Sequence, residues 1–394
     1  MARGDKGSIS SQPLLISSTP TPGPTATPTA TPMPSVTVTT PTPIPNTVIN
    51  SQIITATTTW SVAGSPYLVK GSIRIDEGVT LNVEPGVDVY FVGSANLQVL
   101  GTLRAIGTEN NRITFAGSEN QPWGGILFAG SSVDYTGTVG STLQYVDITG
   151  VEGKVISIDD SYPMISNSSI MHGWIDMRGE VGDSQFLFAN NHIEYFSLVV
   201  NKSSCGGNNF DYLIENNTIS LFETEITIAP QLSCSISLKI RNNLIRREMT
   251  IGNVSGPSDM QITGNTFSGS GNSEELVRIY IEDINLKYSV VGNTFENSVS
   301  ALRLVMTNGH LHSPYVSDNN FINVNEAIKM SGEGNNITLT VSNSYFGTTD
   351  ANELSNLVYD NLDDYNLATV QIVNPRTSPV DINNVVLPTP TPTP

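Results

Sequence analysis

The residues best suited to chemistry are four charged side chains between positions 159 and 178. Asp159, Asp160 and Asp176 carry carboxylates, and Arg178 supplies a cation. In a coiled repeat, as the spacing below predicts, the carboxylates approach one another and Arg178 stacks over Asp159. Crowded carboxylates raise one another's pKa or bind Ca²⁺, which would serve glycoside hydrolysis or β-elimination. The alternative that we favour is that these Asp residues form turns.

A second group could bind a polymer. Arg278, Arg303 and Lys329 follow one another at intervals of 25 and 26 residues, in a protein with 18 basic residues. Stacked like charges repel, so a group of opposite charge should neutralise them. One candidate is a uronate- or sulfate-bearing polymer gripped by the arginines in bidentate fashion. The interpretation we favour is local ion pairing, because Glu275 and Glu326 precede Arg278 and Lys329 by three residues.

Few tryptophan and histidine residues are candidates for binding a ligand or a metal ion. Trp174 is the tryptophan that we expect to stack on a sugar, since Trp60 and Trp123 occupy positions typical of a core. His310 and His312 could chelate a metal ion from one face of a strand, but a solvated loop is the favoured interpretation. No cofactor is expected, apart from Ca²⁺ in the enzyme alternative.

Eight related hexapeptides between residues 165 and 346 position these side chains. They read ISNSSI, FANNHI, IENNTI, IRNNLI, ITGNTF, VVGNTF, VSDNNF and VSNSYF. Their last residues are 22 to 28 residues apart, which is too short for a domain and right for one coil of a solenoid. Apolar ends around a polar middle pair predict a strand, a bend and a strand, and Asn tolerates the left-handed backbone of such a bend.

The fourth hexapeptide position predicts a ladder of stacked side-chain amides. It is Ser in the two outer repeats and Asn in the six inner ones, namely Asn191, Asn217, Asn243, Asn265, Asn293 and Asn319. A further strand lies between successive hexapeptides, so we expect three strands per coil and about eleven coils. Its outward positions are predicted to form the column Ser157, Asp176, Val199, Thr227, Thr250, Arg278, Arg303 and Lys329.

From about residue 60 to 375 the chain resembles right-handed parallel β-helix proteins of the pectin-lyase-like superfamily. TWSVAGSPYLVKGSIRI, GTLRAIGTENNRITF and WGGILF are similar to the first coils of bacterial surface proteins of this type. SNSYFGTTDANELSNLVYD is similar to their last coil and cap, where DANELSNLVYD is expected to form a short helix. The predicted fold class is therefore all-β, a right-handed single-stranded parallel β-helix with terminal caps.

The resemblance implies a place for a ligand but no complete catalytic set. In the enzymes of this superfamily, an acidic polysaccharide lies along the strand between hexapeptides. Polygalacturonase-like members carry NTD, DD, GHG and RIK in order. Here DD occurs at Asp159 and Asp160, MHG at 171–173 follows too soon, and RIK is absent.

The two cysteines are predicted to lie on consecutive coils. Cys205 and Cys234 both fall in the loop after the strand that lies between successive hexapeptides. They could therefore form a disulfide, which would imply an oxidising compartment. Two unpaired thiols are the alternative.

Composition divides the chain and limits its partners. We expect a disordered Thr/Pro-rich stalk over 1–51, the β-helix over 52–387 with its cap at about 347–387, and a Thr/Pro-rich linker over 388–394. The net charge of −18 argues against nucleic acid as a partner. The sequence holds no run of about 18 apolar residues, so membrane insertion is not expected.

These features together predict a secreted or cell-surface module without catalysis that acts as a structural, adhesive or glycan-binding element. A polysaccharide or cell-surface glycan is its expected partner, and the oligomeric state stays open. The first alternative is a lyase or hydrolase of an acidic polysaccharide, and the second is a subunit of a self-assembling extracellular fibre. Most connections are under about ten residues, which favours the non-enzyme, since catalytic walls need long loops.

Overall fold

The structure is a computed structural model of the 394-residue chain. It describes residues 47–130, 132–150, 153–179, 186–202, 209–220, 224–230, 235–254, 259–270, 275–281, 287–306, 315–334 and 336–382. The described residues all belong to one unit, Pro43–Pro394.

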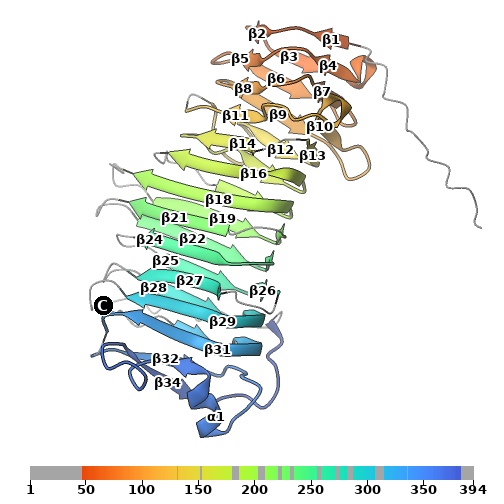
Figure 1. The fold of residues 1–394 in the computed structure, drawn as a ribbon. Coiled ribbons are helices and arrows are strands. Elements are labelled where there is room, and N and C mark those ends of the chain that lie inside the picture. The colour runs from red at the N-terminus through yellow and green to blue at the C-terminus, as the bar shows by residue number, and fades with distance from the viewer. Residues whose placement is uncertain are drawn as a thin grey trace, which may run out of the picture. The chain divides into compact units, whose positions relative to one another are not determined.

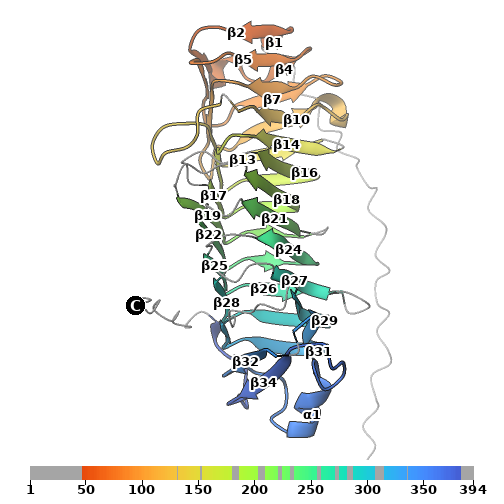
Figure 2. The same ribbon diagram turned by 90° about the vertical axis from the view of Figure 1, so that its left-hand side faces the viewer.

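The described residues form a three-sided stack of coils (Figure 1). Each coil passes through face 1, face 2 and face 3 in turn, and the strands of successive coils pair in parallel. Figure 2 shows β17, β19, β22, β25 and β28 of face 3 following one another along one side of the stack. A parallel ladder with one strand from each coil is the hydrogen-bonding pattern of a β-helix.

Face 1 holds β1 (Thr47–Ile49), β4 (Tyr67–Val69), β7 (Asp88–Phe91), β10 (Ile113–Gly117), β13 (Val146–Thr149), β20 (Thr218–Ile219), β23 (Leu244–Ile245) and β26 (Thr266–Ser268). Face 2 holds β2 (Gln52–Ile54), β5 (Ile73–Ile75), β8 (Leu97–Val99), β11 (Ile126–Phe128), β14 (Lys154–Asp159), β21 (Thr224–Pro230), β24 (Met249–Val254), β27 (Glu275–Ile281) and β33 (Val358–Tyr359). Four long strands contribute to both faces: β16 (Ser169–Gly179), β18 (His192–Lys202), β29 (Thr294–Met306) and β31 (Asn320–Gly332).

Face 3 holds β3 (Thr58–Trp60), β6 (Thr80–Val83), β9 (Thr102–Ile106), β12 (Thr142–Gln144), β15 (Met164–Ser166), β17 (Phe186–Ala189), β19 (Asn209–Glu215), β22 (Ser235–Arg241), β25 (Asp259–Thr263), β28 (Lys287–Val291), β30 (Tyr315–Ser317), β32 (Thr338–Ser342) and β34 (Thr369–Val373). The helical segments of the described residues are η1 (Val62–Gly64), η2 (Ser118–Asn120) and α1 (Ala351–Asn356).

The predicted parallel β-helix is thereby confirmed, with small differences at its ends. Face 3 has thirteen strands among the described residues, compared with the expected eleven or so coils. The last of these strands, β34, lies in the segment that was predicted to form the C-terminal cap. Strand β1 also begins at Thr47, five residues before the predicted start of the domain.

The core consists of the inward-facing apolar side chains of the three faces, which stack in columns from coil to coil. Because side chains alternate along a strand, every second residue is buried, as in the pattern of β5. The sixth hexapeptide position supplies the predicted Ile and Phe columns. Its Phe267, Phe295, Phe321 and Phe346 rings stack with centroids 5.0 to 5.2 Å apart, close to the strand spacing.

The bend of each hexapeptide is left-handed at its third position. The eight residues there have φ between 50° and 65°, and they are Asn167, Asn190, Asn216, Asn242, Gly264, Gly292, Asp318 and Asn343. Asn, Asp and Gly are the residues that adopt this conformation at least cost. Tyr145 and Asn374 have the same conformation one coil earlier and one coil later, so the bend continues beyond the eight hexapeptides.

The fourth position forms the predicted ladder inside the bend. Asn217 is buried, and its Oδ1 accepts hydrogen bonds from the backbone N–H and the Nδ2 of Asn191, at 2.9 and 3.1 Å. Its own Nδ2 donates to the carbonyl of Phe188 and to Oδ1 of Asn243, at 2.9 and 3.0 Å. The same bonds recur along the ladder as far as Asn319, whose N–H donates to Oγ of Ser344 at 3.1 Å.

The C-terminal end is covered by the predicted short helix. Helix α1 starts after Asp350, whose side chain accepts hydrogen bonds from the N–H groups of Asn352 and Glu353, a standard N-cap. Leu354 of α1 is buried against the core. Within the described part of the chain, we find no helix with the length and apolar character needed to cross a membrane.

Candidate binding surface on face 2

The four charged residues singled out in the sequence lie on or beside neighbouring strands of face 2. In the pairing of β14 with β16, Ser157 lies beside Asp176 and Asp159 beside Arg178, as predicted. Lys154 lies beside Trp174 in the same pairing. The outward side of these two strands therefore combines carboxylates, cations and an indole on adjacent coils.

Asp176 is buried and held by two cations. Its side chain is 3% exposed, Oδ1 accepts a hydrogen bond from Nε of Arg178 at 3.0 Å, and Oδ2 forms an ion pair with Lys154. The side chains of Lys154 and Arg178 are themselves 44% and 65% exposed. A buried carboxylate needs such partners to remain charged. The three charges thus form one unit, with the cations exposed to solvent and the anion beneath.

Asp159 and Asp160 lie at the end of β14, where the chain turns. Asp160 has a left-handed backbone with φ of 51°, and its N–H donates to the carbonyl of Arg178 at 3.0 Å. This is the geometry of a turn-forming Asp, the interpretation favoured from the sequence. Both side chains are exposed. In register, Asp159 lies opposite Arg178 and Asp176 opposite Ser157, so the pairing does not put these two carboxylates opposite one another.

Trp174 is the exposed tryptophan, as predicted. It is 38% exposed, and its ring edge lies over Gly153, where a Cβ atom would come within 3.6 Å of it. Trp60 and Trp123 are buried in the core, where they stack on Tyr67 and Phe91. An indole with one exposed surface beside polar and charged groups is suited to stacking on a ligand.

The connection from β11 to β12 borders the site beyond Asp160. It spans 129–141 and is longer than the typical connection expected from the sequence. Asp134 Oδ1 accepts a hydrogen bond from the N–H of Tyr162 at 2.8 Å, and the Tyr135 N–H donates to the Tyr162 carbonyl at 2.9 Å. The described part of this connection is thus fixed to the coil that carries Asp159 and Asp160.

The predicted cation column also lies on face 2. Arg278 pairs in register with Arg303, and Arg303 with Lys329. Glu275 forms ion pairs with both Arg278 and Arg303, the latter at 3.4 Å, and Glu326 lies 2.8 Å from Lys329. The local ion pairing favoured from the sequence is therefore present.

Two further contacts complete this column. Glu248 lies 3.2 Å from Arg278, and Lys329 lies 5.5 Å from the centroid of the Tyr359 ring. Burial lowers the pKa of Arg278, but the hydrogen bond and charge of Glu275, with the charge of Glu248, outweigh it and raise this pKa above its usual range. Three carboxylates thus balance the three stacked cations.

The predicted outward column was wrong at two positions. Asp176 pairs with Ser197 rather than Val199, and the next coil contributes Glu225 rather than Thr227. The reason is a difference of two residues at the bend between faces 1 and 2, since Ile170 pairs with Ile193 but Trp174 with Tyr195. A prediction made by counting residues from the end of the hexapeptide assumes that this bend has the same length on successive coils.

Several predicted features lie outside the described residues. Cys205, Cys234, His310 and His312 are all in this category, so their predicted disulfide and loop roles stay predictions. Among the residues that the structure describes, no group of three or more His, Cys, Asp or Glu side chains could hold a metal ion. The Ca²⁺ of the enzyme alternative likewise stays a prediction.

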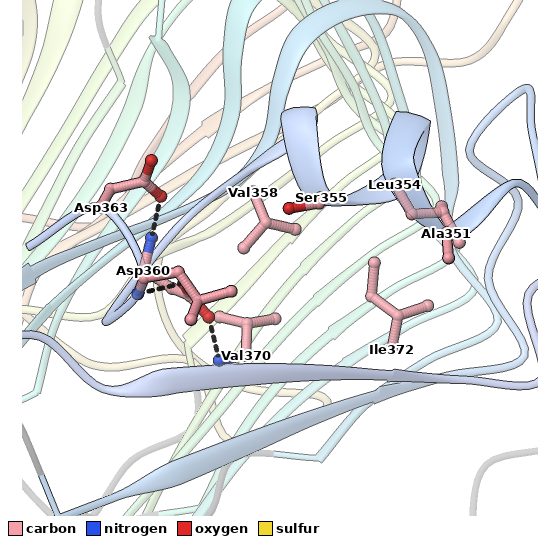
Figure 3. Close-up of a pocket in the computed structure, with 9 residues that line it drawn as sticks. Ala351, Leu354, Ser355, Val358, Asp360, Asp363, Val370 and Ile372 are labelled. Carbon is pink, nitrogen blue, oxygen red and sulfur yellow. Dashed lines mark hydrogen bonds between the residues drawn. The ribbon is translucent and has the colours of Figure 1, made fainter.

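A cavity at the C-terminal end was not predicted from the sequence (Figure 3). Its volume is about 250 Å³, and it opens between α1, β33 and β34. It is lined by Ala351, Leu354, Ser355, Val358, Asp360, Leu362, Asp363, Val370 and Ile372. No sequence signal marks it, because its lining residues all follow the last hexapeptide and lie outside the repeat.

Comparison with known proteins adds little to this picture. No protein-family model and no solved structure matches the chain. A segment of 56 residues is 38% identical to Protein bark beetle of Drosophila melanogaster. That match covers 14% of this chain and 2% of the fly protein, so it does not show a family. The class of this protein is defined by its fold, a parallel β-helix of stacked coils.

Proposed function

We propose that this protein is a non-catalytic extracellular module that binds a glycan on face 2, around Trp174. The observation that carries the proposal is the contrast between two neighbouring side chains. Trp174 exposes 38% of its surface, whereas Asp176 is 3% exposed and bound by two cations. Stacking on a sugar requires an accessible ring, and acid–base catalysis requires an accessible carboxylate.

The polar side chains on the same two strands as Trp174 suit a sugar ligand. The exposed Lys154 and Arg178 carry donors, and the exposed carboxylates of Asp159 and Asp160 carry acceptors for hydroxyl groups. A few polar groups around an apolar platform are the usual composition of such a site.

The charge balance favours a neutral glycan over an acidic one. Along β14 and β16, Lys154 and Arg178 oppose the side chains of Asp159, Asp160 and Asp176. In the cation column, Arg278, Arg303 and Lys329 are each paired with Glu. A polyanion would have to displace these carboxylates, in a protein whose net charge is −18.

A polysaccharide-retention assay tests the proposal. The full chain would be run through gels containing a soluble neutral β-glucan or polygalacturonate, and the same mixtures would be assayed for new reducing or unsaturated ends. We expect retention on the neutral polymer without product release. The Trp174→Ala variant should bind about 10-fold more weakly, corresponding to about 1.4 kcal/mol of stacking energy.

Tyr315→Ala is the matched control, because Tyr315 is a 44% exposed aromatic residue on face 3. It should leave retention unchanged. Equal losses in Trp174→Ala and Tyr315→Ala would contradict a site at Trp174. Product release that disappears in Asp176→Asn would instead establish the enzyme alternative.

A further inference from the structure

The last strand of face 3 has one edge without a strand partner. Strand β34 pairs with β32 on one side, and no described strand pairs with its other side. The N–H of Thr369 donates to the carbonyl of Ile337, at 2.8 Å, on the β32 side. Because successive N–H groups along a strand alternate in direction, that of Val370 points to the outer edge. Such an edge is a template for a strand of another chain.

The carboxylate of Asp360 occupies this edge (Figure 3). Its Oδ2 accepts a hydrogen bond from the N–H of Val370 at 2.6 Å, and its Oδ1 accepts one from the N–H of Leu362 at 2.9 Å. Asp360 is 3% exposed, and none of the ion pairs between described residues includes it. Backbone N–H groups therefore satisfy this buried carboxylate, as in a tight turn.

The loop that follows Asp360 lies across the end of the stack. The Asp360 N–H donates to Oδ2 of Asp363 at 3.1 Å, and Asn361 Nδ2 donates to the carbonyls of Tyr365 and Leu367, at 2.7 and 3.1 Å. Leu362 and Tyr365 in this loop are 83% and 75% exposed. The loop is thus internally hydrogen-bonded, and Asp360 fastens it to β34.

We propose that Asp360 blocks the addition of a second copy of this chain at β34. The strand that fits this edge is β3 of another molecule, since head-to-tail addition continues the parallel ladder of face 3 with its own spacing. An incoming strand would need the N–H of Val370 as a donor, and Asp360 already accepts that hydrogen bond. This inference is independent of the glycan site and argues against fibre assembly through this end.

The first test compares Asp360→Ala with Asp364→Ala in the full chain by size-exclusion chromatography with light scattering. Asp364 is a carboxylate of the same loop whose Oδ1 accepts only local bonds from Asn366, so its removal changes the charge equally. We expect Asp360→Ala to form dimers and larger species as its concentration rises, and Asp364→Ala to remain monomeric. Adding Gln371→Lys on β34 should restore the Asp360→Ala monomer, because lysine on an edge opposes pairing.

Hydrogen exchange supplies a second readout that does not require a stable variant. In the wild type, the Val370 amide should exchange about 10-fold or more slowly than the Ile372 amide on the same edge, because only the former is bonded to Asp360. Rapid exchange of Val370 in the wild type would overturn the proposal. So would an Asp360→Ala or Asp360→Asn variant that folds and stays monomeric at all concentrations.

Discussion

A single buried asparagine in this fold connects three coils. Asn243 accepts from the backbone N–H and Nδ2 of Asn217, donates to the Ile214 carbonyl, and donates to Oδ1 of Asn265. All its side-chain groups are therefore satisfied away from water. Because each Asn satisfies the backbone of the coil before it, a change at one position leaves unpaired groups on its neighbours.

The ladder predicts a graded response at Asn243. Asn243→Ala removes the acceptor of two Asn217 donors, and we expect it to lower the free energy of unfolding by about 3 kcal/mol. Asn243→Ser should cost only about 1 to 2 kcal/mol, because a serine hydroxyl can accept the backbone bond as Ser344 does at the end of the ladder. Denaturant titration measures both values. Equal losses in the two variants would contradict the assigned hydrogen bonds.

Tyr212 gives a prediction for alkaline pH. Burial, followed by the effect of neighbouring Tyr162, raises the pKa of Tyr212 well above its ordinary value of 10.0. Above pH 10 the unfolded chain loses this proton while the folded chain keeps it, so stability is complete below pH 10 and falls as the pH rises further. Tyr212→Phe should make that fall shallower, and Tyr162 and Tyr90, whose pKa values burial also raises, contribute to what remains. Unfolding curves on both sides of pH 10 test this.

At the residue scale, the sequence predicted the ladder but not the environment of Asp176. The ladder was visible because Asn recurs at one position of a repeat. The ion pair with Lys154 was not, because Lys154 precedes Asp176 by 22 residues and meets it only through the register of β14 and β16. The role of Asp360 was hidden for a similar reason, since its partner Val370 belongs to a strand that was assigned to the cap.

At the element scale, register depends on the bends between faces. The column predicted for Arg278, Arg303 and Lys329 was correct. Arg303 and Lys329 lie at the same distance from the paired residues Phe295 and Phe321, whereas Arg278 follows Phe267 by three residues more and still lies in register. The column failed at β18 and β21, because β16 has two more residues at its bend than β18. Counting residues from the repeat therefore predicts contacts reliably where the intervening bend keeps its length, as between β29 and β31.

The cation column gives a prediction at this scale. Arg303→Gln removes a cation whose side chain is 32% exposed and paired with Glu275, so the free energy of unfolding should change by less than about 1 kcal/mol. Retention on the neutral polysaccharide should be unchanged, because the ligand is assigned to Trp174 and not to this column. Affinity electrophoresis of Arg303→Gln and Trp174→Ala in parallel measures the difference in retention between the two variants. A comparable loss in Arg303→Gln would revive the polyanion interpretation.

At the scale of the whole molecule, repeats predict the body of a solenoid well and its ends less well. Each inner coil is held between two similar coils, so its residue types follow the repeat. The terminal strands β3 and β34, the loop after Asp360 and the nearby cavity have a neighbour on one side only, and their sequences depart from the repeat.

The most direct test of a glycan site at Trp174 is a tryptophan fluorescence titration of the full chain with soluble neutral β-glucan. Trp60 and Trp123 are 3% and 4% exposed, so a ligand on the surface should perturb the emission of Trp174 alone. We expect a saturable change in the wild type and none in Trp174→Phe. An undiminished change in Trp174→Phe, or no change in the wild type at any polymer concentration, would contradict it.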